Sequence, residues 1–170
     1  MKLLRLLRRQ ILGLSIVLLA FGMAIALGTS PGKTLPIPTS YGLVVKQSPY
    51  SVEETEKRFL EILDSKGLNT FVTIDHAQNA KGAGLDLRPT RVVIFGNPKL
   101  GTPLMQCDQS LAIDLPQKLL IWQDETDQVN IAYNDPRYIG GRHQIGGCGI
   151  GNIREIAGAL DKLSTSAIAR

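Results

Sequence analysis

The segment LLIWQDETDQVNIAY, residues 119–133, determines how any sheet in this protein must be built. Residues 119–123 and 129–133 are rich in β-branched and aromatic side chains, and the polar residues 124–128 separate them. Two such runs on either side of a short polar segment are typical of a β-hairpin. Because the strands of a hairpin pair antiparallel, the sheet cannot be the all-parallel sheet of a doubly wound fold.

Upstream of the hairpin, the sequence predicts three further strands and one long helix. The helix spans residues 51–66, because Ser51 and Glu54 have the spacing of a capping box and Gly67 is a natural C-terminal stop. After the second strand we expect a loop that includes residues 82–84. The three strands are short, β-rich runs at residues 41–46, 71–74 and 91–95.

Two more helices are expected around the hairpin. Thr102 followed by Pro103 has the pattern of an N-cap with proline at the first helical position, which predicts a short helix to about Cys107. Asn152 and Glu155 open a second long helix, which runs to about residue 163. The order of elements predicts an α+β fold: a two-layer sandwich in which a mixed or antiparallel sheet packs against two longer helices.

The positive charge of the chain is concentrated at its N-terminus. The 170 residues include 19 Lys+Arg and 15 Asp+Glu, a formal charge of +4. Four bases within the first nine residues account for that excess, and the rest of the chain is formally neutral. A domain without net positive charge has little attraction for a phosphate backbone, so we expect no nucleic-acid partner.

The N-terminus has the layout of an export signal. A basic head is followed by the almost wholly apolar residues 11–23 and by Ala24-Ile25-Ala26, so residues 1–26 are predicted to be a signal peptide. The alternative is an uncleaved membrane anchor formed by residues 11–27, which are near the lower length limit for a span. Residues 27–40 are Pro/Gly-rich, so we expect them to form a spacer. Residues 41–166 are expected to form a single domain. The predicted location is periplasmic or otherwise extracytoplasmic.

Cys107 and Cys148 are the only two cysteines of the chain. After export such a pair can be oxidised to a disulfide. There is no CxxC spacing that would indicate thioredoxin-like redox catalysis. The sequence leaves both states open, because it does not show whether the two Cα atoms approach within bonding distance.

Several blocks of this sequence resemble the family called domain of unknown function 302. The specific blocks are FGNPKLGTPLM (residues 95–105) and AIDLPQK (residues 112–118), accompanied by FVTIDHA (residues 71–77), Trp122 and YND (residues 133–135). The resemblance spans about residues 41–163 and implies a compact α/β domain, often homodimeric, with no established activity. It carries no agreed catalytic residues, so we assign none. From the same resemblance we expect a homodimer.

Six polar residues at predicted strand ends and loops form the candidate ligand site. The loop at Asn97 could offer free backbone amides to an anion, with Lys99 adding positive charge, although turn and cap formation explain the same residues. The two histidines have no metal-binding spacing, so no metal or cofactor is expected. The six candidates are His76, Asn97, Lys99, Asp114, Lys118 and His143.

These observations favour an exported domain of the cell envelope without catalytic activity, which binds a small ligand or acts as a structural homodimer. The alternative is an envelope hydrolase or a metal-binding protein that uses His76 or His143 together with the Asn97 loop. The hydrolase hypothesis requires His76, Asp114 and His143 to lie within about 4 Å of one another in a pocket.

Overall fold

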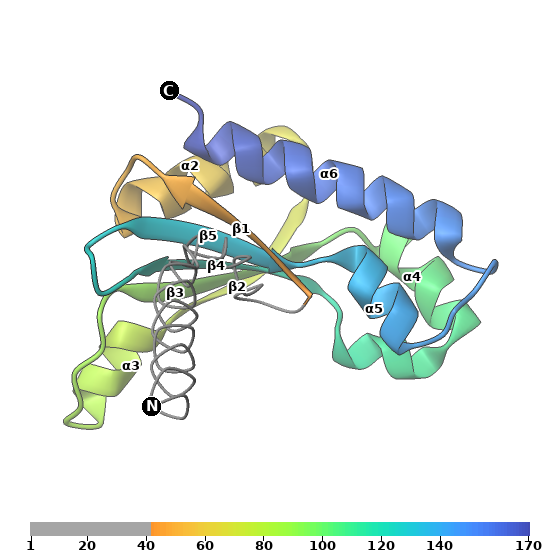
Figure 1. Ribbon diagram of the computed structural model, residues 1–170, viewed down its shortest axis with the longest axis horizontal. Coiled ribbons are helices and arrows are strands. Elements are labelled where there is room, and N and C mark those ends of the chain that lie inside the picture. Colours follow the sequence, from red (N-terminus) through yellow and green to blue (C-terminus); the bar gives the residue numbers. More distant parts are fainter. Residues whose placement is uncertain (1–41) are drawn as a thin grey trace, which may run out of the picture. The chain divides into compact units, whose positions relative to one another are not determined.

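Five strands form a single antiparallel sheet in the order β1-β5-β4-β3-β2 (Figure 1). The computed structural model describes residues 42–170, so the predicted signal peptide or anchor and the spacer lie outside the described residues. Within residues 42–170, no helix is both long and apolar enough to cross a membrane. The strands are β1 (Leu43–Ser48), β2 (Asn69–Asp75), β3 (Thr90–Gly96), β4 (Gln117–Gln123) and β5 (Val129–Asn134).

The predicted hairpin is confirmed: β4 and β5 pair antiparallel, with Gln123 opposite Val129. The turn is held by the Asp124 carboxylate, which accepts hydrogen bonds from the backbone N–H groups of Thr126 and Gln128 at 2.9 and 3.1 Å. Asp127 adopts a φ of 63°, a conformation that Asp and Asn tolerate in turns. Every neighbouring pair of strands is antiparallel, so the sheet, expected to be mixed or antiparallel, is antiparallel throughout.

The two longer helices, α2 and α6, cover one face of the sheet, so the predicted two-layer α+β sandwich is confirmed (Figure 1). Phe59 of α2 and Leu160 of α6 are almost fully buried and pack with Val93, Leu119 and Ile131 of the sheet. The helices are α2 (Val52–Ser65), α3 (His76–Gly82), α4 (Pro98–Cys107), α5 (Pro136–Arg142) and α6 (Ile150–Ile168), with the 3₁₀ helix η1 (Gln109–Ile113).

Alternation along the strands separates the two faces of the sheet. On β3, Val93 and Phe95 point toward α2 and α6, whereas Val92 and Ile94 point to the opposite face. We call the opposite face the open sheet face. By strand register its polar residues include Thr90, Lys118 and Asn130, and its apolar residues include Val45, Val72, Ile74, Val92, Ile94, Leu120, Trp122 and Ala132.

Helix α2 begins and ends as predicted, within one residue. The Ser51 side chain accepts a hydrogen bond from the backbone N–H of Glu54 at 3.2 Å and caps the helix. Gly67, just beyond the C-terminus, has a φ of +63°, which a glycine adopts without steric cost. This helix was predictable because both of its ends are set by nearby residues.

The prediction of a loop after β2 is wrong in part, because residues 76–82 form helix α3. Asp75 ends β2 and also caps α3: its carboxylate accepts from the backbone N–H of Gln78 at 2.8 Å. The segment between Asp75 and Gly82 contains Ala, Gln and Lys, which favour helices. One residue therefore closes a strand and opens a helix.

The starts predicted for the two later helices are also wrong. Helix α4 begins at Pro98 with Asn97 as its cap, so Pro103 lies inside it and Thr102 is not the cap. Helix α6 begins at Ile150 after Gly149, two residues before Asn152, and has no side-chain cap. It continues to Ile168 because its apolar residues remain buried beyond Leu163. The Asn97 cap starts α4 earlier than Thr102 would, whereas tertiary packing extends α6 beyond the local signals.

Candidate functional site

An apolar cavity of about 340 Å³ lies between α4, α6 and the adjoining ends of β2, β3 and β4. This volume is at the lower end of the range for small-molecule pockets. None of its lining side chains is charged, and the polar ones are Asn97, Thr102 and Gln117. The larger apolar side chains around it are Leu68, Phe71, Phe95, Leu100, Met105, Leu115, Ile156, Leu160 and Leu163.

An irregularity in β2 contributes one wall of this cavity. The pairing of β2 with β3 shifts between Thr70 and Val72, so Phe71 is an extra residue in the strand. A bulge of this kind re-aims a side chain away from its expected face. Phe71 lines the cavity and is 54% exposed, which makes it the most accessible aromatic side chain at the cavity rim.

The Asn97 loop forms another wall, and its backbone amides are already used. The N–H of Lys99 donates to the Asn97 side-chain oxygen at 3.0 Å. The N–H groups of Leu100 and Gly101 donate to the Asn97 carbonyl at 3.0 and 3.1 Å, and Pro98 has no N–H. The loop is therefore a helix cap and offers no free amide of the first turn to an anion.

A polar cluster around His143 lies outside the cavity. The Nε2 atom of His143 is 2.7 Å from an oxygen of Asp114, and its Nδ1 atom is 3.0 Å from the Ser110 hydroxyl and 3.6 Å from Asp108. Arg142 donates to both oxygens of Asp114 at 3.0 and 3.2 Å. The His143 side chain is only 7% exposed. We call these five residues the His143 cluster.

Ser110, His143 and Asp114 have the composition of a catalytic triad but not its hydrogen bonding. The Ser110 hydroxyl donates to the Asp108 carboxylate at 2.8 Å, and its oxygen lies 3.0 Å from Nδ1 of His143. The Asp114 carboxylate lies 2.7 Å from Nε2. The Ser110 hydroxyl, which has one proton, therefore donates to Asp108 and not to His143, whereas the serine of a triad donates to its histidine.

Electrostatics agree with a structural role for this cluster. The Ser110 hydroxyl, and then the Ser110 backbone N–H, lower the pKa of Asp108 below its ordinary value. Asp108 also ends α4, and His143 ends α5. The cluster therefore fastens the α4–η1 segment to the end of α5.

The six sequence candidates do not form one site. Asp114 and His143 meet, and Lys118 lies beside them, donating to the backbone carbonyls of Asp114 and Pro116 at 3.3 and 3.1 Å. Asn97 borders the cavity, and Lys99 is exposed at the first turn of α4.

His76 is separated from the other candidates because it starts α3, which lies beside the opposite end of the sheet from α4 and α5 (Figure 1). At that end Asp75 pairs with Arg91, whereas Phe95 pairs with Gln117 at the other. The geometry required by the hydrolase hypothesis is therefore not met.

The end of the sheet next to His76 holds a second polar cluster, centred on Arg91. Its guanidinium contacts Asp75 at 3.1 Å, Glu53 at 3.4 Å, and Glu56, which is 12% exposed. The pKa of Asp75 is lowered by the backbone N–H of Gln78 and also by Arg91. We call Arg91 and its three carboxylates the Arg91 cluster. Within residues 42–170, no group of three His, Cys, Asp or Glu residues is arranged to hold a metal ion.

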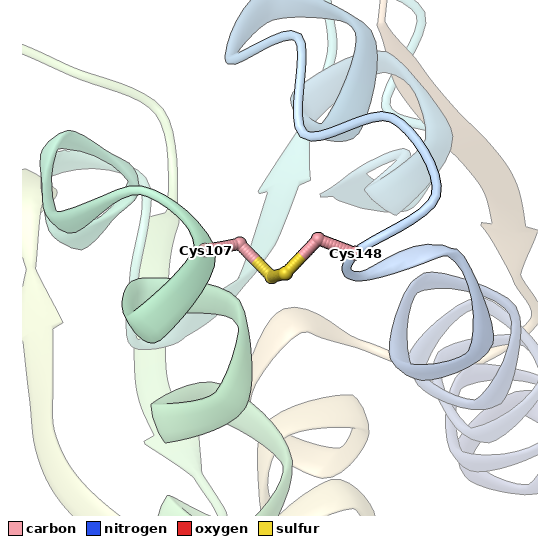
Figure 2. The surroundings of a disulfide bond; sticks show 2 residues. All are labelled: Cys107 and Cys148. Carbon is pink, nitrogen blue, oxygen red and sulfur yellow. A yellow bond between two sulfur atoms is a disulfide. The ribbon is translucent and has the colours of Figure 1, made fainter.

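A disulfide joins two elements that line the cavity (Figure 2). Cys107 is the last residue of α4, and Cys148 lies in the loop two residues before α6. Their Cα atoms are 6.0 Å apart, within the range that a disulfide spans. The bond therefore links the end of α4 to the start of α6, the two helices that line the cavity. We call the contact between these two helices the seam.

Comparison with known sequences agrees with this architecture. The family model described as "Domain of unknown function DUF302" matches residues 44–163. This chain belongs to the DUF302 family. A crystal structure of an uncharacterized conserved DUF302 protein from Bacillus stearothermophilus has the same fold, with a TM-score of 0.61 and 18% identity. The match covers 76% of this chain and 97% of that one.

Curated relatives of this DUF302 chain carry a different name. It is 44% identical over 105 residues to the fluoride-specific ion channel FluC 1 of Brucella suis and to the protein of that name from Brucella abortus. The match covers 62% of this chain but only 41% and 39% of the two relatives. The chain therefore spans about two fifths of the curated proteins that it matches.

The sequence blocks that resemble DUF302 surround the cavity. The block at 95–105 supplies the end of β3 and most of the α4 wall, and the block at 112–118 supplies Leu115 and Pro116. Sequence reasoning missed the cavity itself, because its lining residues read as ordinary core positions. It also missed Ser110 and Asp108, which carry no local signal for contact with His143.

Proposed function

We propose that this DUF302 domain binds a small apolar molecule in the cavity between α4 and α6. The observation that carries the proposal is the lining of the cavity, which is apolar and contains no charged side chain. The amides of the Asn97 loop are already paired, so a phosphate or carboxylate would find no partner there. The ligand is therefore a neutral molecule, with at most one polar group at the Asn97, Thr102 or Gln117 rim.

The location that we propose is extracytoplasmic. The charge and apolar pattern of residues 1–26 supports export. A disulfide that persists also suits an oxidising compartment. Alkaline phosphatase fused after residue 170 would be active in the periplasm, and removal of residues 1–26 would abolish that activity. Equal activity without those residues would contradict export by the N-terminus.

We further propose that the domain works beside a membrane and as a homodimer. The similarity to proteins named fluoride-specific ion channels supports a membrane setting, although channel activity belongs to those proteins. The open sheet face supports the dimer, since Val45 and Val72 at its two edges are 44% and 46% exposed and face the same side of the sheet. Sedimentation of residues 41–170 tests the dimer: Val72→Lys would give monomers, whereas an unchanged mass would place the interface elsewhere.

Ligand binding is tested with the neutral fluorophore N-phenyl-1-naphthylamine and residues 41–170. We expect saturable binding with enhanced fluorescence. Ala159→Phe, which puts a ring into the cavity wall, would weaken binding about tenfold or more. Lys162→Phe adds the same ring at an exposed position of the same helix and serves as the control. Failure of Ala159→Phe to weaken binding would show that the probe sits elsewhere.

A further inference from the structure

The Cys107–Cys148 disulfide occupies a particular place relative to the cavity. Five of the residues that line the cavity come from α4, and four come from α6. Cys107 ends the first of these helices, and Cys148 immediately precedes the cap of the second (Figure 2). The covalent bond therefore spans the seam between two walls that are otherwise far apart along the chain.

No polar contact supports this seam. Among the hydrogen bonds and salt bridges of residues 42–170, none joins α4 to α6 or to the loop 144–149, and the cluster around His143 acts on α5 instead. The contact that remains is apolar and close: a Cβ at Gly149 would lie 2.7 Å from the Leu104 side chain. The disulfide is therefore the covalent link that the described residues provide across a contact which is otherwise apolar.

One of the two cysteines lies at the surface, in a loop rich in glycine. Cys148 is exposed and Cys107 is half-buried. The loop around Cys148 contains Gly146, Gly147 and Gly149, and an added Cβ at Gly147 would meet nothing within 4 Å. Glycines leave the backbone free to take other conformations once the bond is open.

We propose that this disulfide is a redox control of the cavity: the oxidised protein holds the α4 wall against α6 and binds its apolar ligand, and reduction releases the wall and weakens binding. This inference rests on the proposed function. The reductant is a dithiol. Its thiolate attacks Sγ of Cys148, the S–S bond breaks, and the sulfur of Cys107 leaves and takes a proton. The second thiol of the reductant then attacks the mixed disulfide, releasing Cys148 as a thiol and leaving the reductant as a disulfide. Two electrons and two protons thus pass to the protein.

The test measures N-phenyl-1-naphthylamine binding to residues 41–170 in three states: oxidised, reduced with dithiothreitol, and reoxidised after its removal. We expect the reduced protein to bind about tenfold or more weakly, and the reoxidised protein to recover full affinity. Circular dichroism of the same samples shows whether the fold is retained. The variant with Cys107→Ala and Cys148→Ala should behave like the reduced protein and should not respond to dithiothreitol.

Each outcome has one meaning. If the oxidised protein does not bind the probe, the proposed function fails, and this inference fails with it. If the oxidised and reduced proteins bind equally well, the proposed function stands and the redox control alone is overturned. If reduction unfolds the domain, the bond is a support of the whole fold, and the redox control is likewise overturned.

Discussion

Arg91 and Phe95 lie four residues apart on β3 and point to the same face of the sheet, yet their surroundings are opposite in kind. Around Arg91, three carboxylates converge on one guanidinium. Around Phe95, apolar side chains surround an unfilled volume of about 340 Å³. About 13 Å of strand separates the charged region around Arg91 from the apolar cavity beside Phe95.

The two regions are held together by different means. The Arg91 cluster is held by ion pairs, because one guanidinium bridges three carboxylates at the point where α2, β2 and β3 meet. At the cavity end, the disulfide joins α4 to the residues just before α6, and the His143 cluster joins the segment after α4 to the end of α5. The difference is one of chemistry: one end of β3 is charged and held by ion pairs, and the other is apolar and lies beside a disulfide.

The largest effect is expected from removing the covalent fastening. The variant with Cys107→Ala and Cys148→Ala should lose about 4 kcal/mol of unfolding free energy, because the bond closes a segment of 41 residues in the unfolded chain. Urea unfolding measures the loss. Gly147→Ala, an open position in the same loop, is the control and should change stability little. A loss below about 1 kcal/mol would mean that the cavity end needs no outside support.

The next largest effect is expected at the opposite end of β3. Arg91→Ala should cost about 3 kcal/mol, because Glu56 is only 12% exposed and would keep a nearly buried charge without its partner. Arg91→Lys retains the charge but not the planar fork that contacts three carboxylates, so its loss should be smaller. Both are measured by urea unfolding. Equal stability of the wild type and Arg91→Ala would contradict the contrast between the two ends.

A smaller effect is expected from the His143 cluster. His143→Ala removes two hydrogen bonds and should cost about 2 kcal/mol, since Asp114 is 13% exposed and would retain only Arg142. Ser110→Ala, at an exposed position of the same cluster, should cost less than His143→Ala. Neither change touches the cavity lining, so probe binding by the folded variants should persist. Loss of binding in folded Ser110→Ala would instead place this cluster in the ligand site.

The smallest effect is the acid dependence, and it should be common to both ends. The pKa of Asp75 is lowered at the Arg91 end by the Gln78 backbone N–H, and that of Asp108 at the cavity end by the Ser110 hydroxyl. A carboxyl with a lower pKa in the folded protein stabilises it above the ordinary value of about 4, and this stability is lost as the pH falls through the folded pKa. The thermal midpoint should therefore fall below about pH 4. Asp75→Asn should weaken this dependence of the thermal midpoint on pH. An unchanged dependence would contradict its assignment to Asp75.

The elements that were predicted correctly share one property: short-range signals define them. The 124–128 turn is closed by the side chain of its own first residue, and α2 is capped by Ser51 and stopped at Gly67. The predicted start of α4 was wrong because the chain offers two caps of similar local quality, Asn97 and Thr102. Helix α3 was not predicted because Asp75 both ends a strand and caps a helix.

The candidate site was much less predictable. Of the six polar residues selected from loops and strand ends, only Asp114 and His143 meet side chain to side chain. Their contact, and that of His143 with Ser110, joins residues 29 and 33 positions apart. The cavity is assembled from segments between Leu68 and Leu163, and its apolar residues resemble core residues one at a time.

The amino-acid sequence by itself determined the β4–β5 hairpin, helix α2 and the α+β class, because alternation, turn residues and caps act over a few neighbouring positions. The resemblance of whole sequence blocks indicated the DUF302 family. Only the tertiary structure decided that β3 has a charged end and an open apolar end, that His76 and His143 are apart, and that Cys107 meets Cys148. These features depend on the distances between segments that are remote in the chain. Such distances result from packing of the whole core, in which every element settles against several others at once.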